Sequence, residues 1–338
     1  MSPSPRFPTE LFRSVIEHFD PVDDRPALCN LSSTSRLLRL EGQRILYDRV
    51  SFAHEDANNA IKFFTTILAS PERLALLVKA CIIECVDLRR GQELFICALK
   101  AMVNLTTLHL QPIICTAPTG YCQRYPFQLE NLFVGFKGYD EDLFTVFLPS
   151  QPRLKRLEMD TLLPPPGFQL IQDSVCQDLV VLVGDWDVVE VFLPGRHIIS
   201  LMLMPSEDDE CRGYFLPTSV EDLSREFNHL LHFSCRIHIC LHSMIHHLRS
   251  LEILELLSPT LDVSTLVSLP TITFPPEQAA KKLDKMFSTC EMLQWIDLEV
   301  GTDLLRRDKI FHRWNRSSEK GREILLSETE ARRWWKVI

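Results

Sequence analysis

A short leucine pattern recurs along the middle of the chain at a nearly constant interval. It has the form Leu-x-x-Leu-x-Leu, and its copies begin at Leu105, Leu129, Leu154 and Leu179, at steps of 24, 25 and 25 residues. Because alternate side chains of a strand point to one face, the last two apolar residues of each copy predict a short strand with a buried face. One such unit cannot cover its own apolar face. Consecutive units are therefore expected to stack and share one long core.

The same pattern extends in both directions with weaker matches. A fixed period in the twenties is typical of leucine-rich repeats, so the sequence predicts an α/β leucine-rich-repeat solenoid with apolar helices between the strands. The intervals after Ile198 and Leu248 are each close to two periods, and either could hold a degenerate unit or an insertion. The copies, in chain order, are Val78, Cys81 and Ile83; Leu105, Leu108 and Leu110; Leu129, Leu132 and Val134; Leu154, Leu157 and Met159; Leu179 and Leu182; Ile198, Leu201 and Leu203; Leu248, Leu251 and Ile253; and Leu293, Ile296 and Leu298.

Helical rather than strand-like spacing marks the first fifty residues. Apolar residues at helical spacing predict a first helix over residues 7–19, a second around Leu28 and a third from about 35 to 45. Alternation at Val50 and Phe52 then predicts the first strand. The apolar face expected for the first helix consists of Leu11, Phe12, Val15, Ile16 and Phe19.

These first residues resemble an F-box in their ordered set of short motifs. The chain opens with Phe7-Pro8-Thr9-Glu10-Leu11, has Ile16 in the first helix and later carries the Ser35-Arg36 pair. It departs from the family at Leu38, where a Trp is common. The remaining matching positions are Leu28, Leu31, Leu46, Tyr47 and Val50, so that the resemblance covers about residues 5–52.

The resemblance implies a function. F-box proteins dock onto a Skp adaptor, which joins them to a cullin scaffold and a RING ligase, and their leucine-rich repeats hold a protein substrate for ubiquitin transfer. The resemblance therefore implies a substrate-receptor subunit of an SCF-type E3 ubiquitin ligase. The alternative is a stand-alone leucine-rich-repeat scaffold with no ubiquitin role, in which the same residues are only the core of a helical cap. The adaptor contacts carried over by the resemblance are Pro8, Leu11, Ile16, Leu28 and Leu31.

Composition restricts the partners and the compartment. The net charge of −9 argues against general nucleic-acid binding, which needs clustered basic residues. We expect no membrane segment, because charges interrupt the long apolar stretches, and no signal peptide, because the first residues lack an apolar run. The 11 cysteines are odd in number and lack framework spacing, which favours free thiols in the cytosol or nucleus.

Residue patterns give no sign of an enzyme or of a bound cofactor. Phosphate-binding glycine motifs and a nucleophile elbow are absent from the sequence. Residues 229–247 are rich in histidine, and a helix would align His238, His242 and His246, whereas a strand would align His238, Cys240 and His242. The spacing matches no established zinc site, so no metal site is predicted. Cys81 and Cys85 are interpreted as buried apolar positions.

The remaining predictions concern one acidic connection, the C-terminal tail and the division into domains. The acidic insertion 205–223, with Glu207 to Glu210, would favour a basic partner, although drift in a degenerate array explains it nearly as well. Residues 305–338 carry a net charge of +5 and Trp314, Trp334 and Trp335. We interpret this tail as a helical cap on the solenoid, with a nucleic-acid contact as the alternative. The predicted domains are the F-box-like residues 1–52, the solenoid 53–304 and the cap 305–338.

Overall fold

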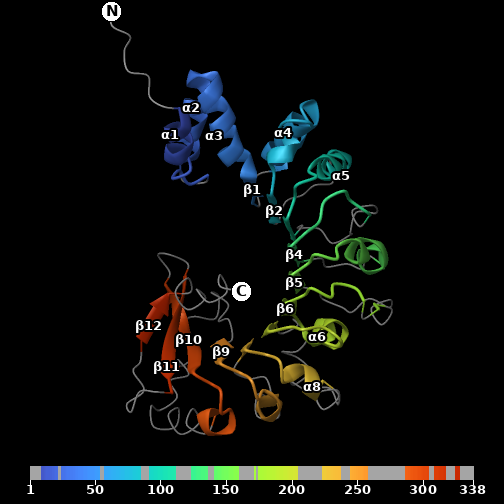
Figure 1. Ribbon diagram of the computed structural model, residues 1–338, viewed down its shortest axis with the longest axis vertical. Coiled ribbons are helices and arrows are strands. Elements are labelled where there is room, and N and C mark those ends of the chain that lie inside the picture. The colour runs from blue at the N-terminus through green and yellow to red at the C-terminus, as the bar shows by residue number, and fades with distance from the viewer. Residues whose placement is uncertain are drawn as a thin grey trace, which may run out of the picture. The chain divides into compact units, whose positions relative to one another are not determined.

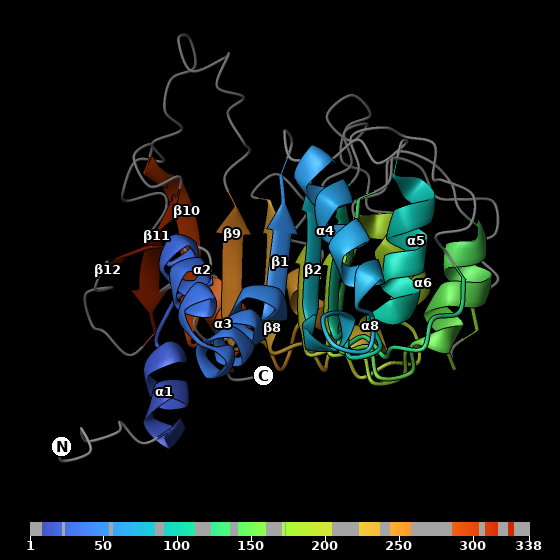
Figure 2. The same ribbon diagram turned by 90° about the horizontal axis from the view of Figure 1, so that it is seen from above.

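The protein is described from a computed structural model, drawn in Figures 1 and 2. Contacts divide the chain into two compact units, Met1–Lys155 with Pro165–Ile171 and Arg156–Pro164 with Gln172–Ile338. The residues that the structure describes are 9–21, 24–53, 57–84, 91–111, 123–135, 141–159, 171–172, 174–204, 223–236, 244–257, 286–303, 308–316 and 324–327.

The first unit begins with helices where the sequence predicts them. They are α1 (Thr9–Ile16), α2 (Arg25–Thr34) and α3 (Arg36–Asp48). α2 and α3 pack closely against each other, and α1 contacts α3. Ile16 and Leu28 are buried, so each of the first two helices contributes an apolar side chain to a shared core.

Parallel strands follow in sequence order and confirm the expected strand positions. They are β1 (Arg49–Phe52), β2 (Ala80–Glu84), β3 (Thr107–Gln111) and β4 (Asn131–Val134). Helices α4 (Ala57–Ala69) and α5 (Gln92–Ala101) lie on one side of these strands (Figures 1 and 2). Short turns of 3-10 helix, η1 (Ala75–Leu77) and η3 (Leu148–Ser150), and of π-helix, η2 (Leu143–Phe147), complete the described elements of this unit.

The apolar residues of the leucine pattern form continuous rows of buried side chains on neighbouring strands. Strand pairing places Cys81 beside Leu108, and Leu108 beside Leu132. The residue that opens each copy, such as Leu105 or Leu129, is also fully buried beneath the strand. On the helical side, Phe64 of α4 and Phe95 of α5 are both buried, with ring centroids 5.2 Å apart. The pattern therefore marks a shared core, as the stacking argument requires.

The second unit repeats the parallel arrangement and ends differently. The parallel strands are β5 (Arg156–Met159), β6 (Val181–Gly184), β7 (Ser200–Leu203), β8 (His232–Arg236), β9 (Ile253–Leu257) and β10 (Trp295–Asp303). Helices α6 (Trp186–Phe192) and α8 (Ser224–Phe227) and the 3-10 turn η6 (Ile245–His247) connect some of them. Both units are thus α/β with parallel strands in sequence order, an arrangement compatible with a solenoid.

In this unit the structure adds one copy of the pattern, at β8, and changes the register of another, at β9. The gap after Ile198 holds a further unit, β8, whose inward residues are Phe233 and Cys235. The copy assigned to Leu248, Leu251 and Ile253 is wrong in register by three residues. Leu254, rather than Leu251, lies beside Phe233 and Ile296 in the buried row. The sequence HLRSLEILEL fits the pattern in both registers, and only pairing with the neighbouring strands selects one.

The described part of the tail also differs from the predicted helical cap. β11 (Asp308–Asn315) and β12 (Ile324–Ser327) are strands, and they pair antiparallel with β10 and with each other. A helical interpretation of these residues is therefore wrong. Without β11, the outer edge of β10 would carry unpaired backbone groups, and an antiparallel strand satisfies them in a way that a helix cannot. The expected helix after Ser327 lies outside the described residues.

The fourth copy lacks its third apolar residue for a packing reason. Gly184 occupies that position, beside Leu203 of the next strand. A Cβ atom at Gly184 would lie only 2.7 Å from Val188 Cγ1. Asp185 caps α6 by accepting a hydrogen bond from Val188 N at 2.9 Å. Because the helix starts directly after the strand, Val188 fills the place that a leucine fills elsewhere.

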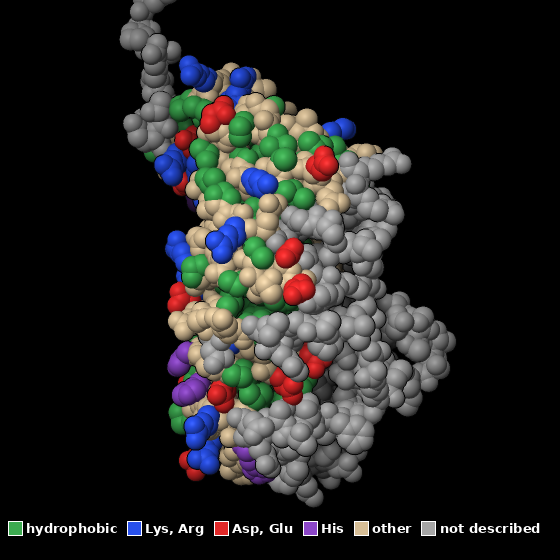
Figure 3. All heavy atoms as spheres, turned by 90° about the vertical axis from the view of Figure 1, so that its right-hand side faces the viewer, with side chains coloured by type: hydrophobic (Ala, Val, Ile, Leu, Met, Phe, Trp, Pro, Cys, Tyr) green, Lys and Arg blue, Asp and Glu red, His purple; other side chains and the backbone are tan. Residues whose placement is uncertain are grey.

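Several other expectations fall on residues that the structure does not describe. They concern Cys85, residues 205–222 with Glu207 to Glu210, and the metal-ligand candidates His238, Cys240 and His242. Within the described ranges, no helix combines the length and the hydropathy needed to cross a bilayer. On the face drawn in Figure 3, hydrophobic, basic and acidic side chains are interspersed.

Candidate protein-interaction surface

The helices at the start of the first unit are defined by local sequence signals. Ser35 separates α2 from α3 in an extended conformation, and its Oγ accepts a hydrogen bond from Leu38 N at 3.2 Å. This is the N-cap arrangement that satisfies a free backbone donor of the first helical turn. α2 carries a Pro in its first turn, where the missing N–H has no helical partner to lose. The chain therefore makes a sharp break between two helices that then fold back on each other.

A glycine allows those two helices to approach closely. Gly42 is buried in the middle of α3, and a Cβ atom there would overlap Ser32 Oγ and lie 3.3 Å from Leu28 O. The Ser32 hydroxyl donates a hydrogen bond to Leu28 O at 2.7 Å, so it has little freedom to move away. Glycine normally weakens a helix interior. Here the close packing of α2 on α3 accounts for it.

α1 presents an apolar face to solvent. Leu11 is 46% exposed and Val15 is 51% exposed, and both lie on one side of the helix because they are four residues apart. We call these two residues the α1 apolar face. Leu40 of α3 is a third exposed aliphatic side chain, at 49%. Large apolar side chains grouped at a surface indicate an interaction site more often than isolated ones do.

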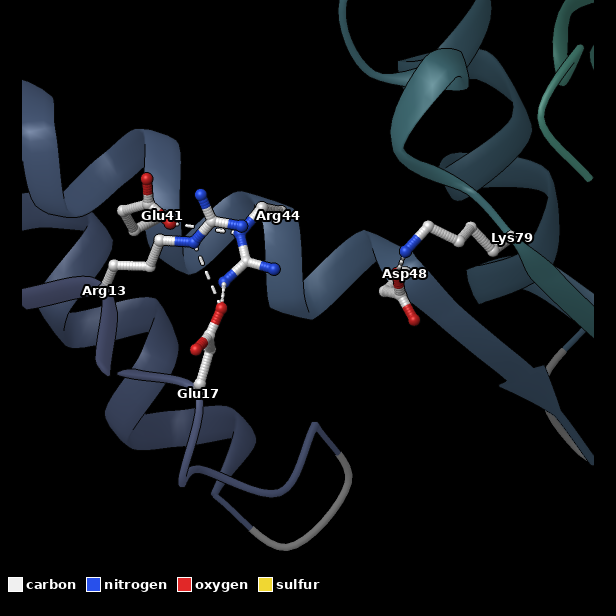
Figure 4. A network of polar contacts seen from close by, with 6 residues as sticks. All are labelled: Arg13, Glu17, Glu41, Arg44, Asp48 and Lys79. Atoms are coloured by element: carbon white, nitrogen blue, oxygen red, sulfur yellow. Dashed lines mark hydrogen bonds and ion pairs between the residues drawn. The ribbon is translucent and has the colours of Figure 1, made fainter. Parts of the chain in front are cut away.

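A group of charged side chains ties α1 to α3 (Figure 4). Glu17 accepts hydrogen bonds from Arg13 Nε at 3.1 Å and from Arg44 Nη2 at 3.0 Å, and Arg44 Nε also donates to Glu41 at 3.0 Å. The hydrogen bond from Arg13, helped by the charge of Arg44, lowers the pKa of Glu17 below its usual value. These groups are exposed, so their energetic contribution is small. They link α1 and the residue that follows it to α3 at the surface.

The end of α3 is attached to the first strands. The Lys79 ammonium lies 2.7 Å from Asp48 Oδ1, and Lys79 N also donates to Asp48 O at 2.9 Å (Figure 4). Tyr47 stacks on Phe63 of α4 at a centroid distance of 5.8 Å, and Phe63 contacts Phe52 of β1 at 5.3 Å. The helices are therefore joined to the first strand by backbone, ionic and aromatic contacts, all within one unit.

The five predicted adaptor contacts occupy different environments. Leu11 is exposed and Leu31 is half-buried, whereas Ile16 and Leu28 lie in the core. Pro8 lies outside the described residues. The sequence prediction placed Val15 on the apolar face of the first helix, and it did not select Val15 or Leu40 as contacts. The sequence signal for a shared Leu11 and Val15 surface was their spacing of four residues, which places both on one side of a helix. An apolar stripe at positions i, i+1, i+4 and i+5 is wider than one helix contact covers, so one edge remains open.

The strand faces opposite the helices differ between the two units. In the first unit, Ile82, His109 and Phe133 lie side by side on neighbouring strands, and His109 and Phe133 have ring centroids 3.7 Å apart. His109 and Phe133 are half-buried, while Ile82 is nearly covered. His109 Nδ1 lies 3.8 Å from Glu84, whose side chain is 47% exposed. This face therefore offers a partly exposed aromatic surface beside a carboxylate.

In the second unit the corresponding face carries a buried polar row. Ser200 Oγ and His232 Nδ1 are 2.9 Å apart, and His232 Nε2 lies 3.6 Å from Glu255. These residue types could form a nucleophile, a base and an acid, but Ser200 has no exposed surface. We therefore interpret the row as part of the core of this unit.

The row continues to an ion pair between the buried Asp297 and the half-buried Arg313 at the antiparallel strands. Glu255 of β9 lies opposite Asp297 of the neighbouring strand β10. Arg313 of β11 donates two hydrogen bonds to Asp297, at 2.7 and 2.6 Å. Burial raises the pKa of Asp297 and the nearby Glu255 adds to that effect, whereas Arg313 opposes both. Asp297 and Arg313 are register partners on β10 and β11, so this bidentate ion pair connects the two strands.

Comparison with known proteins does not assign the chain to a family. No protein-family model matches the sequence, and no curated protein matches it either.

Proposed function

We propose that this protein is a substrate-receptor subunit of an SCF-type E3 ubiquitin ligase that binds a Skp-type adaptor through α1. The observation that carries the proposal is the α1 apolar face. Leu11 and Val15 are about half exposed on a helix whose opposite side is held in the core by Ile16. Burial of both side chains by a partner would remove apolar surface from water, worth roughly 25 cal/mol per Å² before the costs of association.

The attachment of the helices supports a role in positioning a second partner. α3 runs directly into β1, and the Asp48–Lys79 contacts join it to β2. A protein bound to α1 would therefore stand in a defined position relative to the strands of the first unit. The substrate in this proposal is a protein held on the repeat-like strands, an assignment that follows the leucine-rich-repeat and F-box resemblance. The half-buried aromatic surface around His109 and Phe133 is the described surface best suited to it.

The test is binding of a purified Skp-type adaptor to the full chain and to matched surface variants. Leu11→Asp and Val15→Asp each place a charge in the α1 apolar face. Their controls are Leu76→Asp and Val103→Asp, which change the same residue types at sites of similar exposure, 40% and 41%. We expect loss of adaptor binding of at least tenfold for the two α1 variants and less than twofold for the controls. Circular dichroism of each variant establishes that the fold is retained.

The alternative, a stand-alone interaction scaffold, predicts a different outcome of the same experiment. A folded wild-type chain that does not bind the adaptor, or α1 variants that bind as well as their controls, would refute the ligase proposal. In the scaffold alternative the apolar face of α1 would be occupied by another partner, and the strands would keep their binding role.

A further inference from the structure

Two histidines from separate parts of the sequence meet at the surface of the second unit. His197 and His229 are both exposed, and their ring centroids are 5.3 Å apart with the planes inclined at 35°. Each directly precedes the buried residue that opens a repeat copy, Ile198 or Leu230. They therefore hold the same position on neighbouring repeats.

The backbone holds this pair in register. Leu231 N donates a hydrogen bond to Ile199 O at 2.9 Å, and His232 N donates to the same oxygen at 3.0 Å. These bonds lie only two and three residues away from the two rings. Ile198 and Leu230 are fully or almost fully buried, so the chain cannot slide without exposing them. The separation of the two histidine backbones is thus set by the stacking of two repeats.

We propose that His197 and His229 form a binding site for a late first-row divalent cation such as Zn²⁺ or Cu²⁺. Imidazole nitrogens bind these cations at about 2.0–2.1 Å, and two rings on one tetrahedral ion have their centres ~5 Å apart. The observed 5.3 Å matches this separation. Hard cations such as Mg²⁺ and Ca²⁺ prefer oxygen ligands and are not expected to bind.

The surroundings leave both rings available to a cation. Within the described part of the chain, neither ring makes a hydrogen bond or an ion pair. The adjacent positive charge, Arg196, is buried and donates its hydrogen bonds to backbone carbonyls, so its guanidinium is turned away from solvent. Asp178 holds the equivalent exposed position before Leu179, on the preceding repeat.

The site is expected to be a two-ligand surface site. Among the described residues, no group of three or more His, Cys, Asp or Glu side chains could hold a metal ion together. Water would therefore complete the coordination. The sequence drew attention to the histidines of 229–247 through spacing within one segment. The structure instead pairs His229 of that segment with His197, 32 residues earlier in the chain.

The experiment is Cu²⁺ and Zn²⁺ titration of the full chain by calorimetry, with Cu²⁺ electron paramagnetic resonance to count nitrogen ligands. The variants are His197→Ala, His229→Ala and the double substitution. His18→Ala is the control, because His18 is also exposed but belongs to the other unit. Unfolding curves without metal should be the same for all variants, since each loses only an exposed ring.

A shared ion gives a distinctive pattern of effects. Each single substitution should weaken the tightest site at least tenfold, the double variant should be little weaker than either single one, and the control should match the wild type. The wild-type resonance should show two equivalent nitrogens. Retention of affinity within twofold in either single variant, additive losses in the double variant, or a one-nitrogen spectrum would each overturn the proposal.

Discussion

Arg196 should contribute more to the stability of the second unit than any exposed charge. It is only 5% exposed, and its guanidinium donates five hydrogen bonds to backbone carbonyls. Two acceptors, Val191 O and Phe192 O, belong to the last turn of α6, where carbonyls have no helical partner. Gly195, at φ 69°, makes the turn that brings Arg196 back beneath this helix end.

The expected loss follows from what Arg196→Met leaves behind. Methionine keeps most of the apolar stem, so the packing change is small. The bonds to Val175 O at 2.8 Å and Phe192 O at 3.2 Å are buried, whereas the other three carbonyls are partly exposed and can regain water. A buried carbonyl without a partner costs about 1–3 kcal/mol. Two of them give a predicted loss of about 4 kcal/mol.

The assay is urea unfolding by circular dichroism, with hydrogen exchange of peptides that contain α6 to report on the second unit alone. Arg225→Met is the matched control, because Arg225 is exposed in the same unit, and it should change stability by less than about 0.5 kcal/mol. Arg196→Lys should fall between the two, since an ammonium cannot reach acceptors spread around a planar guanidinium. A loss below about 1 kcal/mol for Arg196→Met would refute the argument that these carbonyls depend on one side chain.

Three further outcomes are expected. Gly42→Ala should lower the unfolding midpoint in urea, although alanine is the better helix former, because its Cβ would overlap Ser32; an unchanged or higher midpoint would contradict the packing argument. Gly184→Leu, which restores the repeat pattern, should cost about 1–3 kcal/mol because Val188 occupies the space, and thermal unfolding measures it. Burial raises the pKa of Cys81 to about 12. This thiol should therefore lose its proton at a lower pH in the unfolded chain than in the folded one. The free energy of unfolding should then fall as pH rises above about 9, and it should fall less in Cys81→Ala. An equal fall in both chains would argue against the raised pKa.

Sequence alone was sufficient for the elements whose signals are local. A strand with one buried face is predicted by the apolar alternation of about five residues. The repetition of this alternation along the chain predicted β2 to β7 and β10 together with their buried rows. The helices at the start of the chain were predicted for the same reason. Helical spacing is set within a few residues, so it does not depend on the rest of the protein.

Only the tertiary structure decided what depends on neighbours. The apolar stripe of α1 is wider than its contact with α3, so the sequence could not show that Val15 is exposed while Ile16 is buried. The register of β9 follows from its pairing with β8, because its own sequence fits two registers. The pairing of His197 with His229 likewise follows from the stacking of two repeats. Periodicity reports which residues share a face, whereas burial and contact depend on which other surface meets that face.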